Sequence, residues 1–79
     1  MEEPQPGERY IHFKGKDRLY EIVGIARDCN NLSKLSVIYK SLYDSEIFPI
    51  GTIFSRSLED FVGFKDVNGA KVKRFTKIN

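Results

Sequence analysis

The sequence has few of the residues that crosslink a small protein, bind metals or take part in catalysis. Among 79 residues there are one cysteine, one histidine, one methionine and no tryptophan. A single cysteine, Cys29, excludes an internal disulfide, the common staple of small secreted domains. A structural zinc site needs about four Cys or His ligands, so we expect no metal site. No apolar run reaches the roughly 18 residues of a membrane span, and we expect a cytoplasmic protein.

Patterns typical of cofactor sites and of catalysis are also missing. Gly63 and Gly69 precede no predicted helix, so the sequence lacks a phosphate-binding loop and we expect no cofactor. His12 is the only candidate general base of the usual kind. A reaction that uses His12 with Cys29 as the nucleophile is the enzymatic alternative. The two residues are far apart in the sequence, and we expect a protein that is not an enzyme.

Length and charge divide the chain into a short leader and one domain. Residues 1–8 contain two prolines and three acidic residues, and we expect a flexible leader there, because proline disfavours both helix and ladder pairing. Residues 9–79 suffice for a single β-barrel domain, which at this size buries only about 60% of the surface of the unfolded chain. Residues 65–79 hold five basic residues against Asp66, although the total net charge is only +2.

Apolar, β-branched and aromatic residues recur in short stretches and predict an all-β fold. Extended segments are expected at residues 10–14, 19–26, 35–43, 50–56, 62–67 and 70–78. The pair Asn68-Gly69 is the strongest hairpin signal and predicts a type I′ turn. Ser57, with Asp60 three residues later, predicts an N-cap and one short helical turn near 57–61.

Five or six short strands in one small domain hide their edges best by curling into a small barrel. Gly24 interrupts the segment 19–26, and such a glycine predicts a bulge or bend that lets a long strand curl. Strict alternation in this segment gives two faces, Leu19, Glu21, Val23 and Ile25 against Tyr20, Ile22, Gly24 and Ala26. The phenylalanines expected in the core are Phe13, Phe61, Phe64 and Phe75.

Five short motifs follow one another along the chain. They are YIHFKG at residues 10–15, YEIVGIA at 20–26, VIYKSLY at 37–43, RSLEDF at 56–61 and VNGAKVKRF at 67–75. Their order and spacing resemble domain-of-unknown-function family 1653 over most of the chain. This resemblance implies a small bacterial-type domain with an SH3-like β-barrel, and it implies no established activity.

Aromatic and basic residues on the expected strands form the candidate binding site. In a barrel we expect His12, Tyr39 and Arg56 to converge on a shallow groove, with Lys40 and Tyr43 at its rim. Tyrosine rings would supply flat contact area, and Arg56 would hold a carboxylate or phosphate in a forked geometry. We therefore expect a non-enzymatic binding module for a peptide, a nucleotide or another small anionic ligand.

Structural roles are the alternative for two of these residues. His12 could bond a backbone carbonyl and cap the mouth of the barrel. Arg56 precedes the expected helical turn and could form a salt bridge with Glu59 or Asp60. In that case neither side chain would be available to a ligand.

Two other functions stay open. Single-stranded nucleic-acid binding is predicted by the basic residues near the C-terminus, which are Lys65, Lys71, Lys73, Arg74 and Lys77. Self-association or docking of a partner is predicted by an open barrel edge. The sequence leaves the partner unknown, and we expect a monomer or a weak homo-oligomer.

Overall fold

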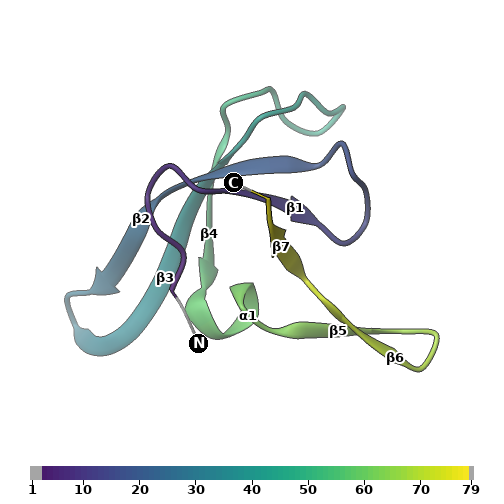
Figure 1. Cartoon of the computed structure of the whole chain (residues 1–79). Coiled ribbons are helices and arrows are strands. Elements are labelled where there is room, and N and C mark those ends of the chain that lie inside the picture. Colours follow the sequence, from purple (N-terminus) through teal and green to yellow (C-terminus); the bar gives the residue numbers. More distant parts are fainter. Residues whose placement is uncertain (1–2, 79) are drawn as a thin grey trace.

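The computed structural model describes residues 3–78, which form an all-β fold with seven strands in two sheets and one short helix (Figure 1). The strands are β1 (Arg9–His12), β2 (Leu19–Asp28), β3 (Asn31–Ser41), β4 (Ile53–Ser57), β5 (Phe64–Val67), β6 (Ala70–Lys73) and β7 (Phe75–Lys77). The helix α1 is the single turn Leu58–Phe61. The predicted all-β class and the predicted helical turn are confirmed.

The larger sheet has the antiparallel order β4-β3-β2-β1-β7, and β5 and β6 form a separate hairpin. The larger sheet is not closed, since β4 and β7 are its two edges. The predicted strand 70–78 is divided at Arg74, which raises the strand count above the predicted five or six. The Arg74 amide donates to the Gly63 carbonyl at 3.1 Å, and its carbonyl accepts from the Phe13 amide at 3.0 Å. At this residue the chain therefore changes its partner from the β5 side to the β1 side.

Aromatic side chains join the two edges that hydrogen bonds leave apart. Phe61, in the turn that follows β4, stacks on Phe75 of β7 with ring centroids 4.2 Å apart and planes 8° apart. The buried core consists of Tyr20, Ile22, Val37, Tyr39, Phe61 and Phe75. The core prediction is thus confirmed for Phe61 and Phe75 and is wrong for Phe64, which is 55% exposed on β5. Phe13 is half-buried.

The predicted irregularity at Gly24 is confirmed, and it reverses the faces of β2. Ile22 pairs with Tyr39 while Gly24 pairs with Ile38, so Val23 is an extra residue without a partner on β3. Ile22 is 2% exposed, Val23 is 47% exposed, and Ile25 packs against the core. The strict alternation predicted for this strand is therefore wrong beyond Ile22, because one inserted residue shifts every later side chain to the opposite face.

The segment before β1 lies against β2. Pro4 is buried, the Gly7 amide donates to the Ile22 carbonyl at 2.9 Å, and the Ile22 amide donates to the Glu8 carbonyl at 2.9 Å. The Lys77 ammonium lies 2.8 Å from the Glu8 carboxylate and so ties this segment to β7. Residues 1–2 of the predicted leader lie outside the described residues, as does residue 79.

The hairpin of β5 and β6 projects from the rest of the domain (Figure 1). Asn68 and Gly69 connect its strands with φ angles of 51° and 83°, so the predicted turn, with positive φ at both central residues, is confirmed. All eight strand residues are exposed. An isolated two-stranded hairpin is at best marginally stable in water, so the anchoring of this hairpin at its base is important.

The base of the hairpin is held by the turn α1. Ser57 caps this turn, since its hydroxyl accepts a hydrogen bond from the Asp60 amide at 3.3 Å, as predicted. Gly63 lies two residues after α1 and packs so closely that an added Cβ would lie 2.9 Å from the Glu59 carbonyl oxygen. This backbone contact leaves no room for a side chain between α1 and β5.

Gly63 and Gly24 should respond differently to substitution by alanine. We expect Gly63→Ala to lower the free energy of unfolding by about 1–3 kcal/mol, as overpacking does. An added Cβ at Gly24 meets no atom within 4 Å, so we expect Gly24→Ala to leave stability unchanged or to raise it by about 0.4–1 kcal/mol. Urea unfolding of both variants measures this difference. Equal losses in the two variants would contradict the assigned packing at Gly63.

Candidate functional site

Three of the five predicted groove residues meet at one ring. The His12 ring lies 5.1 Å from Phe75 in an edge-to-face contact, and the Arg56 guanidinium lies over the same ring at 5.5 Å. Tyr39 contacts Phe75 at 5.5 Å, and its hydroxyl accepts a hydrogen bond from Arg56 Nε at 3.3 Å. The structure therefore brings His12, Tyr39 and Arg56 together, although Tyr39 is only 4% exposed and belongs to the core.

Lys40 and Tyr43 do not form the expected rim. The Lys40 ammonium lies 3.5 Å from Glu21 Oε2, on the face of the sheet opposite to the buried Tyr39 ring. The Tyr43 hydroxyl lies 2.6 Å from the Tyr20 hydroxyl, one ring further from Phe75. Burial and this hydrogen bond raise the pKa of Tyr20.

His12 is held in its neutral form. Its Nδ1 accepts a hydrogen bond from the Lys14 amide at 3.2 Å, a contact that protonation of Nδ1 would break. Burial is the main cause that lowers the pKa of His12 to about 4, and nearby positive charges contribute to the same shift. This geometry differs from the predicted structural role, in which the imidazole bonds a backbone carbonyl.

The positive charges around His12 come from separate parts of the chain. We define the cationic cluster as His12 with the four cations that act on it, Arg56, Lys14, Arg18 and Arg74. The backbone brings them there, because the His12 amide donates to the Arg18 carbonyl at 3.1 Å and the neighbouring Phe13 amide bonds the Arg74 carbonyl. Within residues 3–78, Arg56 forms no salt bridge with Glu59 or Asp60. It is Arg74 whose Nε donates to the Asp60 carbonyl, at 3.1 Å.

The basic residues near the C-terminus do not share one surface. Lys73 pairs with Phe64 and Lys71 with Asp66, whereas Lys65 pairs with Val72, so Lys65 lies on the opposite face of the hairpin. Lys77 lies on β7 and binds Glu8. Arg74 belongs to the cationic cluster described above. The five residues therefore divide among the two hairpin faces, the edge of the larger sheet and the cationic cluster.

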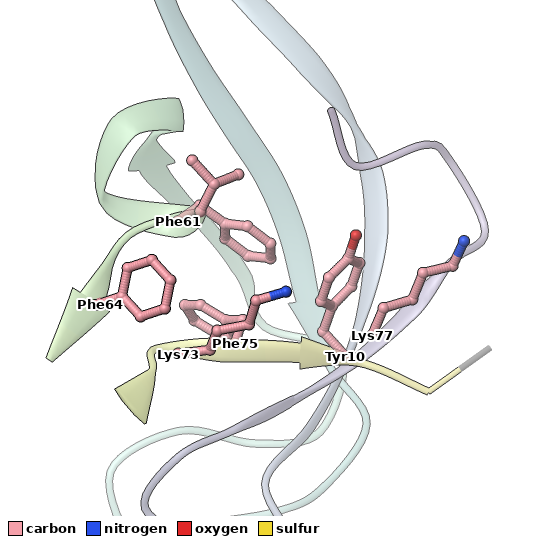
Figure 2. A pocket seen from close by; sticks show the side chains of 7 residues that line it. Tyr10, Phe61, Phe64, Lys73, Phe75 and Lys77 are labelled. Atoms are coloured by element: carbon pink, nitrogen blue, oxygen red, sulfur yellow. The ribbon is translucent and has the colours of Figure 1, made fainter. Parts of the chain in front are cut away.

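A cleft of about 450 Å³ opens between the base of the hairpin and the larger sheet (Figure 2). We call it the aromatic cleft, and its lining residues are Tyr10, Phe61, Val62, Phe64, Lys73, Phe75 and Lys77. Figure 2 shows Phe64 and Tyr10 on opposite sides of the cleft with Phe61 between them. Sequence reasoning missed this site because it placed its phenylalanines in the core. The signal available was the Asn68-Gly69 turn, which makes Phe64 and Lys73 cross-strand neighbours.

The two lysines of the aromatic cleft differ in their surroundings. The Lys77 ammonium binds the Glu8 carboxylate at 2.8 Å and lowers the pKa of Glu8, and the Tyr10 hydroxyl donates to the same carboxylate at 3.2 Å. Lys73 forms no salt bridge within residues 3–78. Its ammonium is directed across the cleft toward Tyr10 in Figure 2.

Other chemistry finds little support in the described part of the chain. Cys29 lies in the turn after β2. His12 lies beside the other end of this ten-residue strand, where its amide bonds the Arg18 carbonyl. No group of three His, Cys, Asp or Glu side chains within residues 3–78 is placed to hold a metal ion. None of the helical structure between residues 3 and 78 is long and apolar enough to cross a membrane.

The comparison with protein families confirms the resemblance that the five motifs indicate. The family described as "Protein of unknown function (DUF1653)" matches residues 8–77. The chain belongs to this family. No curated protein and no solved structure matches the chain. The range matched to DUF1653 extends from the residue before β1 to the last residue of β7, so the cationic cluster and the aromatic cleft both lie within the family domain.

His12 should titrate far below an ordinary histidine in this DUF1653 domain. We expect NMR to give a pKa of about 4 in the folded protein, whereas an unfolded histidine has a pKa of about 6.5. Between these values the unfolded chain binds more protons, so the free energy of unfolding falls as the pH is lowered through this window. Above a pH of about 6.5 this group has no effect on stability.

Two variants test the cause of this shift. Arg56→Gln removes a positive charge and should raise the pKa of His12. His12→Gln should reduce the fall in stability between pH 6.5 and pH 4, because a neutral amide replaces the titrating group. A His12 pKa near 6.5, or one that Arg56→Gln leaves unchanged, would show that the cationic cluster is not assembled around this ring.

Proposed function

We propose that this protein is a small non-enzymatic binding domain that holds an anionic group of its ligand at the cationic cluster. The group is a carboxylate or phosphate, carried by a peptide, a nucleotide or another small molecule. Arg56 is the principal contact, because a guanidinium presents its N–H donors in a fork that fits both anions. Tyr39 and Phe75 position Arg56 through a hydrogen bond and a ring contact.

Uncompensated positive charge is the observation that carries this proposal. Lys14, Arg18 and Arg56 form no salt bridge within residues 3–78. Asp17, the acidic residue of the same turn, pairs with none of them in that part of the chain. Like charges from separate segments repel one another, and a surface of one sign attracts counter-ions, so a bound anion would stabilise this arrangement.

The architecture that supports the site is, in this proposal, a small SH3-like barrel. The order β4-β3-β2-β1-β7, the bulged β2 and the helical turn after β4 support it, and the stack of Phe61 on Phe75 spans the gap between the sheet edges. We also propose a bacterial-type domain that works in the cytoplasm, where the exposed free thiol of Cys29 would stay reduced.

The two other functions have weaker support. Nucleic-acid binding through the C-terminal residues needs a continuous basic surface, and the hairpin divides Lys65 from Lys71 and Lys73. Self-association could use the exposed edge of β4, which carries the exposed Ile53. Neither alternative explains why four cations gather around His12.

Inorganic phosphate is the simplest probe of the proposed site. We expect phosphate to shift the amide signals of residues 12–18 and to raise the pKa of His12, because a bound anion offsets the surrounding positive charge. Arg56→Gln should weaken phosphate binding roughly tenfold, the scale of a lost hydrogen bond to a charged group. NMR titration at low salt measures both effects.

Arg27→Gln is the matched control. Arg27 is exposed near the far end of β2, where its side chain bonds the Leu32 carbonyl. Its loss changes the net charge as much as Arg56→Gln does, but it should leave phosphate affinity nearly unchanged. If both substitutions weaken phosphate binding equally, net charge explains the effect, and a site at Arg56 is refuted. Shifts confined to residues 64–73 would move the anion to the hairpin.

A further inference from the structure

The aromatic cleft is a second site that the proposed function does not use. It shares no residue with the cationic cluster, and Phe75 is the ring that both sites contact. Its volume of about 450 Å³ lies within the range of roughly 300–1,000 Å³ that small-molecule sites occupy. Phe64, which lines the cleft, is more than half exposed, so a ligand can reach the cleft without rearrangement of the core.

The walls of the cleft suit a flat ring. Phe61 and Phe75 are stacked and nearly parallel, and Tyr10 meets Phe61 edge to face at 5.2 Å. Phe64 stands on the opposite wall and is 55% exposed, an unusual state for a phenylalanine. Aromatic rings prefer offset-stacked or edge-to-face neighbours 4.5–7 Å away, so an aromatic ligand can contact both walls.

The charge in the cleft selects an anion. Lys77 is paired with Glu8, and these two charges largely offset each other. Lys73 has no such counter-ion within residues 3–78, and it is the cross-strand partner of Phe64. Ring contact and positive charge therefore come from two adjacent residues of the same hairpin face.

We propose that the aromatic cleft binds a planar aromatic ring that carries an anionic group. The ring lies between Phe64 and Tyr10, and the anion pairs with the Lys73 ammonium. An aromatic carboxylate and a nucleotide share this chemistry, and titration with one probe of each kind separates them. A bound ring also adds contacts between the hairpin and the larger sheet, so ligand binding should slow hydrogen exchange of the β5 and β6 amides.

NMR titration with 1-naphthoate and, separately, with adenosine monophosphate tests this site. We expect amide shifts at Phe64, Lys73 and Phe75 with at least one of them, and the better ligand identifies the source class. Neutral 1-naphthamide keeps the ring and lacks the charge. It should bind the same residues about two- to fivefold more weakly than 1-naphthoate, the scale of one exposed ion pair.

Exposed residues supply variants that should fold normally. Phe64→Ala should weaken both naphthyl probes roughly tenfold, as the loss of a stacking ring does. Lys73→Gln should weaken only the anionic probes and should remove the difference between 1-naphthoate and 1-naphthamide. Lys65→Gln is the matched control, because Lys65 lies on the opposite face of the same hairpin and should not affect any probe.

The outcomes separate this site from the cationic cluster. Shifts at residues 12–18 that Arg56→Gln abolishes would assign both anionic probes to the cationic cluster and overturn the proposal. The proposal would also be overturned if neither 1-naphthoate nor adenosine monophosphate caused amide shifts at millimolar concentration. Equal effects of Lys73→Gln and Lys65→Gln would show attraction to the whole hairpin rather than to a site. Failure of phosphate to bind near His12 leaves this inference untouched, because the cleft does not involve that cluster.

Discussion

The contact between the Phe61 and Phe75 rings holds the larger sheet in its curved form. The sheet has two free edges, β4 and β7, and no ladder of hydrogen bonds joins them. The 4.2 Å stack spans this gap, and Tyr10 and Tyr39 each pack edge-on against Phe61. Such ring pairs contribute about 0.5–1.5 kcal/mol beyond their buried area, which is a large share of the stability of a 79-residue chain.

Both proposed sites are consequences of this stack. Arg56 lies over the Phe75 ring, and His12 meets the same ring in an edge-to-face contact. Two members of the cationic cluster therefore contact a buried core side chain. The same pair of rings forms the floor of the aromatic cleft, with Phe64 and Lys73 added by the hairpin. In both proposals the same core rings therefore support the binding surface. The buried ring of Phe75 should help to preorganise Arg56, which lies over it.

Local chemistry was enough to predict the turns and caps. Asn68-Gly69, Ser57 and Gly24 each act through their own backbone, so the hairpin, the helical turn and the bulge could be placed from the sequence. The convergence of His12, Tyr39 and Arg56 was also predicted, because each lies on a strand of one small sheet. Side-chain faces after the bulge were not predictable, since an inserted residue inverts alternation and a sequence does not show which residue is extra. Phe64 was misassigned because hydrophobicity does not reveal that β5 leaves the sheet for a hairpin of its own.

A double-mutant cycle between Phe61 and Phe75 tests the central claim most directly. Urea unfolding of Phe61→Leu, Phe75→Leu and the double variant gives their coupling free energy, and the pair Phe75→Leu with Val67→Ala on the exposed hairpin is the control. We expect a coupling of about 0.5–1.5 kcal/mol for the stacked pair and additivity within about 0.3–0.5 kcal/mol for the control. Additive losses for Phe61 and Phe75 would show that their rings do not join the edges of the sheet.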